Sequence, residues 1–171
     1  MTATTHVELR LRAAKEGIET RVVHGASIAT AVAGLTGLTS YKFGRATTIV
    51  FPDGSYFPTS PYDVVRENLA RGLHTLCLLD LCAAESRYMT AREGAALLLR
   101  MEEERKEGAL SRETLVVAIA RAGSSDALVA RGTLAAMARA DLGAPLHALV
   151  VPGRLHFVEE EAVRAFAREV A

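Results

Sequence analysis

Apolar residues follow two spacings that alternate along the chain, a helical spacing and short continuous runs. Residues 5–17 predict a helix that ends at Gly17, a common residue type just past helix C-termini. Val7, Leu9 and Leu11 also alternate as they would in a strand. We interpret the segment as a helix, because the segment after it is a better strand and needs a partner element.

The remaining segments repeat this alternation up to the C-terminus. Ser27 and Thr90 are N-cap residues of two predicted helices, and Glu93 completes a capping box with Thr90. Continuous apolar runs predict strands that are covered on both faces. The predicted strands are residues 18–23, 46–51, 73–81, 114–124 and 147–153, and the predicted helices lie in residues 24–37, 60–72, 90–108, 132–143 and 157–170.

This order of helices and strands predicts an α/β fold. The length of 171 residues fits one domain, or a small domain with part of another. A turn-rich stretch with clustered aromatic residues begins at about residue 40, which places a boundary between structural units near residues 40 to 45.

The composition limits the kinds of molecule that this chain is expected to bind. Twenty basic and twenty acidic residues give a net charge of zero, which argues against a nucleic-acid binder. No apolar run reaches the length of a membrane span, and the N-terminus does not resemble a signal peptide, so we expect a cytoplasmic protein without a membrane partner. Cys77 and Cys82 are expected to be buried thiols, because two cysteines five residues apart make no zinc site.

Ligands of open α/β sheets bind on loops beyond the carboxyl ends of strands. Ser27 and Ile28 could present main-chain N–H groups to an anionic ligand, or could form only a capped helix. Gly123 allows either a close approach of a ligand or an ordinary turn. The rule selects four loops, residues 22–28, 78–85, 119–126 and 150–156.

Three polar side chains near the predicted sheet ends are open to more than one interpretation. Asp80 is a ribose ligand, a cap or a surface carboxylate, and His147 and His156 are either site residues or packing residues. The chain contains no GxxxxGK[ST], complete GxGxxG, GxSxG or HExxH motif. From the residues alone, the chain is a soluble α/β domain with a candidate small-molecule cleft.

Seven segments in register resemble the diphthine synthase family, which belongs to the tetrapyrrole methylase-like class. Their order and spacing are more specific than any one of them. The segments are "ATTHVELRLRAAKEGIE", "HGASI", "GLTGLTSYKFG", "SPYDVVRENLARGLHTLCLLDL", "YMTAREGAALLL", "TLVVAIARAGS" and "VVPGRLHFVEEE".

The resemblance implies an enzyme that uses S-adenosylmethionine to methylate the amine of a modified histidine on translation elongation factor two, a step of diphthamide biosynthesis. It also implies a homodimer. A neutral amine is a competent nucleophile, so such an enzyme mainly positions the donor and the acceptor. No metal and no covalent intermediate are required, and no residue stands out as a general base, so the catalytic residues are unknown.

The resemblance also implies which residues form the cofactor pocket. Leu78 and Ala122 would give apolar or main-chain contacts to the adenosine, and His147 a polar contact. The pocket would consist of Thr2, Ser27, Ile28, Leu78, Ala122 and His147.

This sequence departs from the pattern of the family at the start of the chain. Members of the family carry a strand, a glycine-rich loop and a Gly-Asp-Pro stretch before the position of Thr2, and this sequence does not contain them. Residues 1–42 are therefore expected to form a partial N-terminal α/β half-domain with exposed edges, and residues 43–171 a complete C-terminal α/β domain with a mixed sheet. We expect this chain alone to be a weak or inactive methyltransferase.

Two alternatives stay open. One is a methyltransferase that acts on a porphyrin-like small molecule, and the other is a non-catalytic fragment of the same fold that serves dimerisation or interaction. A methylation assay with both acceptor types separates the first from the diphthine reaction. A blocked cleft and a large exposed apolar patch would favour the second.

Overall fold

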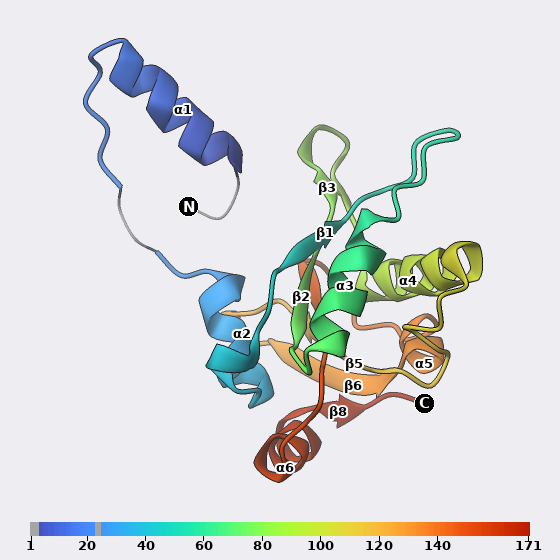
Figure 1. Ribbon diagram of the computed structural model, residues 1–171. Coiled ribbons are helices and arrows are strands. Elements are labelled where there is room, and N and C mark those ends of the chain that lie inside the picture. The colour runs from blue at the N-terminus through green and yellow to red at the C-terminus, as the bar shows by residue number, and fades with distance from the viewer. Residues whose placement is uncertain (1–3, 23–24) are drawn as a thin grey trace.

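A mixed six-stranded sheet forms the centre of the computed structural model, which describes residues 4–22 and 25–171 (Figure 1). The strand order is β1-β2-β7-β5-β6-β8. A separate hairpin pairs β3 (Leu81–Cys82) with β4 (Arg87–Tyr88). The strands of the large sheet are β1 (Thr47–Ile49), β2 (Thr75–Leu79), β5 (Leu115–Ala120), β6 (Leu128–Thr133), β7 (His147–Val151) and β8 (Arg168–Glu169).

The direction of β7 decides which loops meet. β1 runs parallel to β2, whereas β7 lies between β2 and β5 and is antiparallel to both. The carboxyl ends of β2 and β5 therefore meet at the same end of the sheet as the first residue of β7. The predicted mixed sheet is confirmed.

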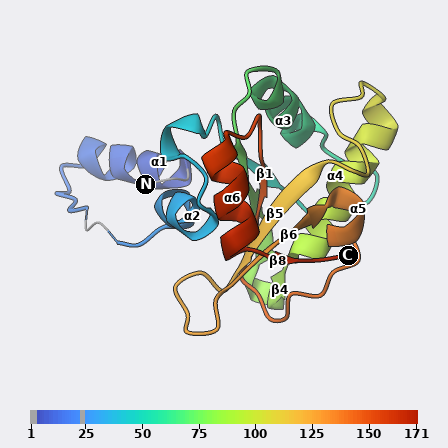
Figure 2. The ribbon, with the colours of Figure 1, turned by 90° about the horizontal axis from the view of Figure 1, so that it is seen from below.

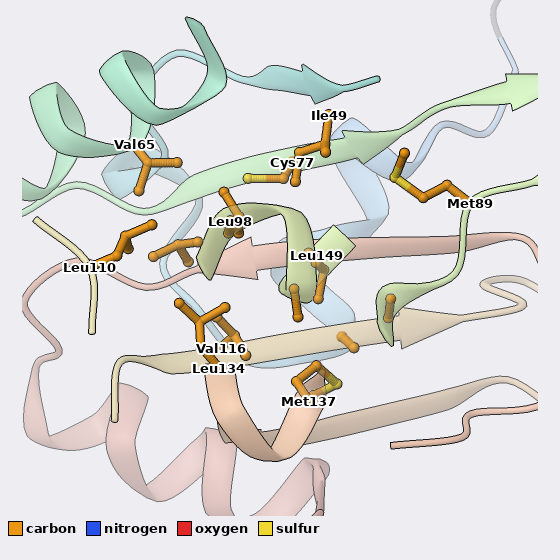
Figure 3. Close-up of a cluster of buried hydrophobic side chains, with 14 of the residues drawn as sticks. Ile49, Val65, Cys77, Met89, Leu98, Leu110, Val116, Leu134, Met137 and Leu149 are labelled. Atoms are coloured by element: carbon orange, nitrogen blue, oxygen red, sulfur yellow. The ribbon is translucent and has the colours of Figure 1, made fainter. Parts of the chain in front are cut away.

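Two layers of helices cover the sheet. Helices α3 (Ser60–Ala70), α4 (Ala91–Arg105) and α5 (Leu134–Met137) cover one face, and α2 (Ile28–Thr36) and α6 (Phe157–Phe166) cover the other (Figure 2). The alternation of side chains along β5 serves both faces, because Val116 and Ala118 enter the first core cluster and Val117 and Ile119 the second. Figure 3 shows the first cluster, with Leu98 of α4 and Met137 of α5 among its members.

Helix α1 (Thr4–Lys15) lies apart from these layers (Figure 1). Its Val7, Leu9 and Leu11 side chains are exposed, although all three are apolar. The predicted helix in residues 5–17 is confirmed, and Gly17 has the positive φ that favours glycine after a helix. Neither the core clusters nor the sheet contains a residue of this helix.

Three predictions of secondary structure are wrong. Residues 18–22 of the predicted strand 18–23 form no strand, because none of the described strands pairs with them; Val23 lies outside the described residues. Residues 132–143 contain only the short α5, since β6 pairs with β5 as far as Thr133. The helix expected over 157–170 ends at Phe166, and Arg168 then pairs with β6.

A buried carboxylate joins α6 to three other segments. Glu159, in the first turn of α6, is 1% exposed and accepts hydrogen bonds from the main-chain N–H groups of Thr39 (2.9 Å) and His156 (2.8 Å). The Lys42 ammonium group also pairs with it. His74 is fully buried, and its Nε2 lies 3.0 Å from Glu159 Oε1. Since four polar groups surround this carboxylate, its charge is compensated inside the protein.

The tautomer of His74 follows from its second contact. The main-chain N–H of Gly153 donates to His74 Nδ1 (3.0 Å), so Nε2 carries the proton and donates to Glu159. Burial lowers the pKa of His74, partly opposed by Glu159, and favours this neutral form. The ring thereby connects the start of β2 to the loop after β7.

Candidate functional site

Three of the predicted site residues lie at one end of the sheet, on neighbouring strands. Leu78 of β2 is the register partner of Ala148, and Ala120 of β5 is the partner of His147. Ala122 follows β5 by two residues and is exposed. The end where β2 and β5 finish and β7 begins therefore brings Leu78, Ala122 and His147 together.

Ile28, the first residue of α2, lies on the face covered by α2 and α6. Ile28 and Leu78 both pack against the second core cluster, which also contains Ile119 and Ala148 near the strand ends. Ser27 is the N-cap and accepts a hydrogen bond from the N–H of Ala29 (3.3 Å), which confirms the capping prediction. Thr2 lies outside the described residues.

The side chain of His147 points to the opposite face. Its Nδ1 accepts from the N–H of Ala91, the first residue of α4 (3.1 Å), and its Nε2 donates to the carbonyl of Ala144 (2.9 Å). Both ring nitrogens are thus used within the protein. The ring of His147 therefore lies on the α4 side of the sheet, whereas Ile28 and Leu78 pack on the α2 side.

His147 is expected to be neutral in the folded protein, and folding should depend on it. Burial is the main cause that lowers its pKa from 6.5, so its stabilising effect is present above about pH 6.5 and is lost as the pH falls. We expect His147→Leu to lower the free energy of unfolding at pH 8 by about 1–2 kcal/mol, because the N–H of Ala91 loses its partner.

Urea unfolding of the wild type and the variant at pH 8 and pH 5 measures this effect. The deficit of the variant should be smaller at pH 5. A deficit that is equal at both values would contradict a neutral, hydrogen-bonded ring.

Two cavities flank this end of the sheet. A cavity of about 400 Å³ lies at the outer edge of β1 and reaches Leu78; Arg45, Thr47, Thr48 and Ser60 also line it. A smaller cavity of about 110 Å³ lies on the α4 side and includes His147, Arg92 and Asp141. Of the predicted pocket residues, Leu78 lines the larger cavity and His147 the smaller one; α3 also contributes Ser60 and Val64 to the larger cavity.

One other candidate lies away from this site, and Asp80, directly after β2, has a structural role. The loop at residues 150–156 lies at the opposite end of the sheet, because β7 runs antiparallel to β2 and β5. His156 there is the N-cap of α6, with Nδ1 accepting from Val158 (3.4 Å). Asp80 holds its own loop, since its carboxylate accepts from the N–H groups of Phe51 (3.0 Å) and Leu81 (2.9 Å).

The chemistry available at the site is binding and orientation. Within the described parts of the chain, no group of three or more His, Cys, Asp or Glu side chains could hold a metal ion. Cys77 is fully buried, and its burial raises the pKa of the thiol to about 12, so it is an inert core residue as predicted; Cys82 is only half-buried. No described helix is long and apolar enough to cross a membrane.

Comparison with known proteins gives consistent matches. The profile of the family described as Tetrapyrrole (Corrin/Porphyrin) Methylases matches residues 1–138. The diphthine synthase of Methanocaldococcus jannaschii is 48% identical over 172 residues, which cover 99% of this chain and 66% of that protein. The diphthine synthase of Methanococcus maripaludis is 49% identical and is matched over 96% of this chain and 64% of its own length.

Solved structures agree with these relatives. The crystal structure of a diphthine synthase superposes with a TM-score of 0.86 at 37% identity, over 99% of this chain and 62% of that one. An Entamoeba histolytica structure assigned as a diphthine synthase gives a TM-score of 0.91 at 33% identity, over 98% and 67%. The chain thus spans about two thirds of the length of these proteins.

Proposed function

We propose, since this chain belongs to the tetrapyrrole (corrin/porphyrin) methylase family, that it forms part of the S-adenosylmethionine site of a diphthine synthase. The reaction would be the methylation of the amine of a modified histidine on translation elongation factor two. The observation that supports the proposal is that Leu78, Ala122 and His147 meet at one end of the sheet, and that Ile28 packs against the same core cluster as Leu78.

The proposed cofactor site combines an apolar wall with main-chain polar groups. Ile28 and Leu78 are half-buried on the α2 face and suit the flat surface of an adenine ring. Ala122 lies just after β5 and His147 is the first residue of β7, and main-chain groups at such strand ends can bind a ligand. These residue types fit an adenosine. Ser27 and Thr2 complete the proposed set.

When bound, S-adenosylmethionine would supply an electrophilic methyl group. The residues of the chain would hold the donor and exclude water, so that the acceptor amine meets the methyl carbon in line. The cavity beside Leu78 supports a place for that acceptor, because this one proposed cofactor residue is part of its lining. Arg45 contributes a positive charge there and none of the lining residues is acidic, which favours the neutral, nucleophilic form of an amine.

The domain division is part of the same proposal. Residues 1–42 would belong to the cofactor-binding half-domain and residues 43–171 to the C-terminal domain. Helix α2 would connect the two, because it belongs to the first and packs on α6 and β5 of the second. We also propose a cytoplasmic homodimer, which light scattering tests; a monomer at every concentration would count against the dimer.

Titration with S-adenosylhomocysteine, followed by NMR of the 171-residue chain, tests the cofactor site. We expect weak binding, toward the millimolar end of the affinity scale. The amide signals of Ser27, Ile28, Leu78, Ala122 and His147 should shift. Weak binding is expected because these residues form only part of the proposed pocket.

Two variants, each with an alanine replaced by glutamate, test whether the shifts come from the proposed site. Ala122→Glu should abolish the shifts, because it places a charge at the proposed adenosine contact. Ala84→Glu, on an exposed turn of the β3–β4 hairpin, should leave them unchanged. Shifts that occur elsewhere, or that persist in Ala122→Glu, would refute the site.

Two other functions are favoured by single observations. The family description names corrin and porphyrin acceptors, so a methylation assay should offer a porphyrin-like acceptor beside the elongation factor. The exposed Val7, Leu9, Leu11 and Ile18 side chains suit an interaction surface, as in the non-catalytic alternative. The NMR titration separates this alternative, which requires no cofactor, from both methyltransferases.

A further inference from the structure

Arg121 has a backbone conformation that is unfavourable for its residue type. It follows β5 directly and has a φ of 52°, in the left-handed region that is strained for a residue with a Cβ. Such conformations persist where the surroundings hold them, and they concentrate at binding sites. The contacts of Arg121 therefore indicate what this conformation serves.

The guanidinium group of Arg121 joins two loops. Its Nη1 donates to the carbonyl oxygens of Leu142 (2.8 Å) and Ala144 (2.8 Å), in the loop before β7. Its Nε donates to Asp126 Oδ2 (2.6 Å) and its Nη2 to the Asp126 carbonyl (3.2 Å), in the loop after β5. The main-chain N–H of Arg121 donates to the carbonyl of Leu146 (2.8 Å).

The packing around this group is tight. The Arg121 side chain is only 18% exposed. A Cβ added at Gly143 would lie 3.3 Å from Arg121 Nη1, and Gly143 itself has a φ of +79°. The guanidinium thus occupies a closely fitted space, in which four of its five N–H groups have a carbonyl or carboxylate partner.

We infer that Arg121 is a positioning residue for the cofactor site. Ala122 is its neighbour in the chain, and His147 follows Leu146, whose carbonyl takes the Arg121 N–H. At Ala122 and His147, the proposed contacts with the ligand are made by the main chain or by atoms next to it. One guanidinium therefore fixes the two segments of main chain that the ligand would touch. This inference rests on the proposed function.

The alternative is that Arg121 makes only an exposed ion pair with Asp126, which would contribute little. A lysine would replace such a charge, but it cannot reproduce a planar guanidinium that donates to three carbonyls and a carboxylate. Arg121→Lys thus distinguishes positioning from charge. Arg121→Met removes both. Arg164→Met is the matched control, because Arg164 is highly exposed and pairs only with Glu160 at 3.8 Å among the described residues.

The test measures amide hydrogen exchange in residues 142–147 of the full chain, together with the shifts caused by S-adenosylhomocysteine. Arg121→Met and Arg121→Lys should both speed exchange in this loop at least about tenfold, while β5 keeps its protection. At a fixed subsaturating concentration, the bound fraction should fall about tenfold in both variants. Arg164→Met should match the wild type in both measurements.

The outcomes separate this inference from the proposed function. Unchanged amide hydrogen exchange in Arg121→Met would show that the guanidinium does not hold the two loops, whether or not the wild type binds the ligand. Faster exchange with unchanged binding, or full rescue by lysine, would overturn the positioning role. If the wild-type chain shows no ligand-induced shifts, the proposed cofactor site is contradicted, and with it the role of Arg121 in positioning that site.

Discussion

Replacing Glu159 with alanine is expected to lower the free energy of unfolding by about 3–5 kcal/mol, the usual cost of removing one partner from a buried charge network. The Lys42 ammonium group would lose its carboxylate, and the N–H groups of Thr39 and His156 would lose their acceptor. The Nε2–H of the buried His74 would also be left without a partner. Denaturant unfolding at pH 7 measures the change.

The next residue supplies the control. Glu160 is half-exposed and pairs only with Arg164 at 3.8 Å within the described chain, so Glu160→Ala should change the free energy of unfolding by less than about 0.5 kcal/mol. Equal effects of the two substitutions would show that the Glu159 network contributes no more than a surface ion pair.

The stabilisation by Glu159 should depend on pH with a definite sign. Desolvation raises the pKa of its carboxyl, but the hydrogen bonds from His156 and Thr39 and the pairing with Lys42 together depress it far below its usual 4.5. A group with a depressed folded pKa stabilises the protein above the unfolded pKa and loses this effect as the pH falls. The difference between wild type and Glu159→Ala should therefore shrink below about pH 4.5.

Gly153→Ala is expected to destabilise the protein by about 3 kcal/mol, from overpacking and the weakening of one buried hydrogen bond. An added Cβ would lie 2.5 Å from the Gly72 carbonyl carbon and 2.5 Å from the Leu73 carbonyl oxygen. Both atoms belong to main chain, so one segment must move. That movement would disturb the bond from the Gly153 N–H to His74.

A second glycine gives the opposite expectation under the same substitution. Gly34 lies inside α2, and a Cβ there would meet no atom within 4 Å. Gly34→Ala should stabilise the protein by about 0.5–1 kcal/mol, because alanine favours a helix. Thermal unfolding of both variants checks the pair. A mild effect of Gly153→Ala would mean that the contact with Gly72 relaxes easily.

The sequence predicted most clearly those elements whose signals are local. The capping box of Thr90 and Glu93 has all its partners within four residues, and the structure confirms it. The N-cap Ser27 is confirmed for the same reason. Strand β6 was not predicted, since its residues 128–133 gain strand structure by pairing with β5. Their own sequence carries only a short apolar run.

The candidate site also has parts that local sequence signals predict and parts that depend on distant residues. Strand ends and the glycine turn at Gly123 placed the loops around Leu78 and Ala122, and the resemblance added the cofactor. The direction of β7 could not be read from its own residues, because orientation in a sheet depends on distant partners. For this reason the sequence alone groups the loop at 150–156 with the other three, although it lies at the opposite end of the sheet.

The position of β7 also has a consequence for the order in which the chain folds. β2 and β5 both need β7 as a neighbour, yet β7 begins only at residue 147. During synthesis, β2 in the β1–β2 pair and β5 in the β5–β6 hairpin must each keep an open edge until β7 leaves the ribosome. We therefore expect ribosome-stalled chains that end before residue 147 to be protease-sensitive and prone to aggregation, whereas chains extended past β8 close the sheet in one late step.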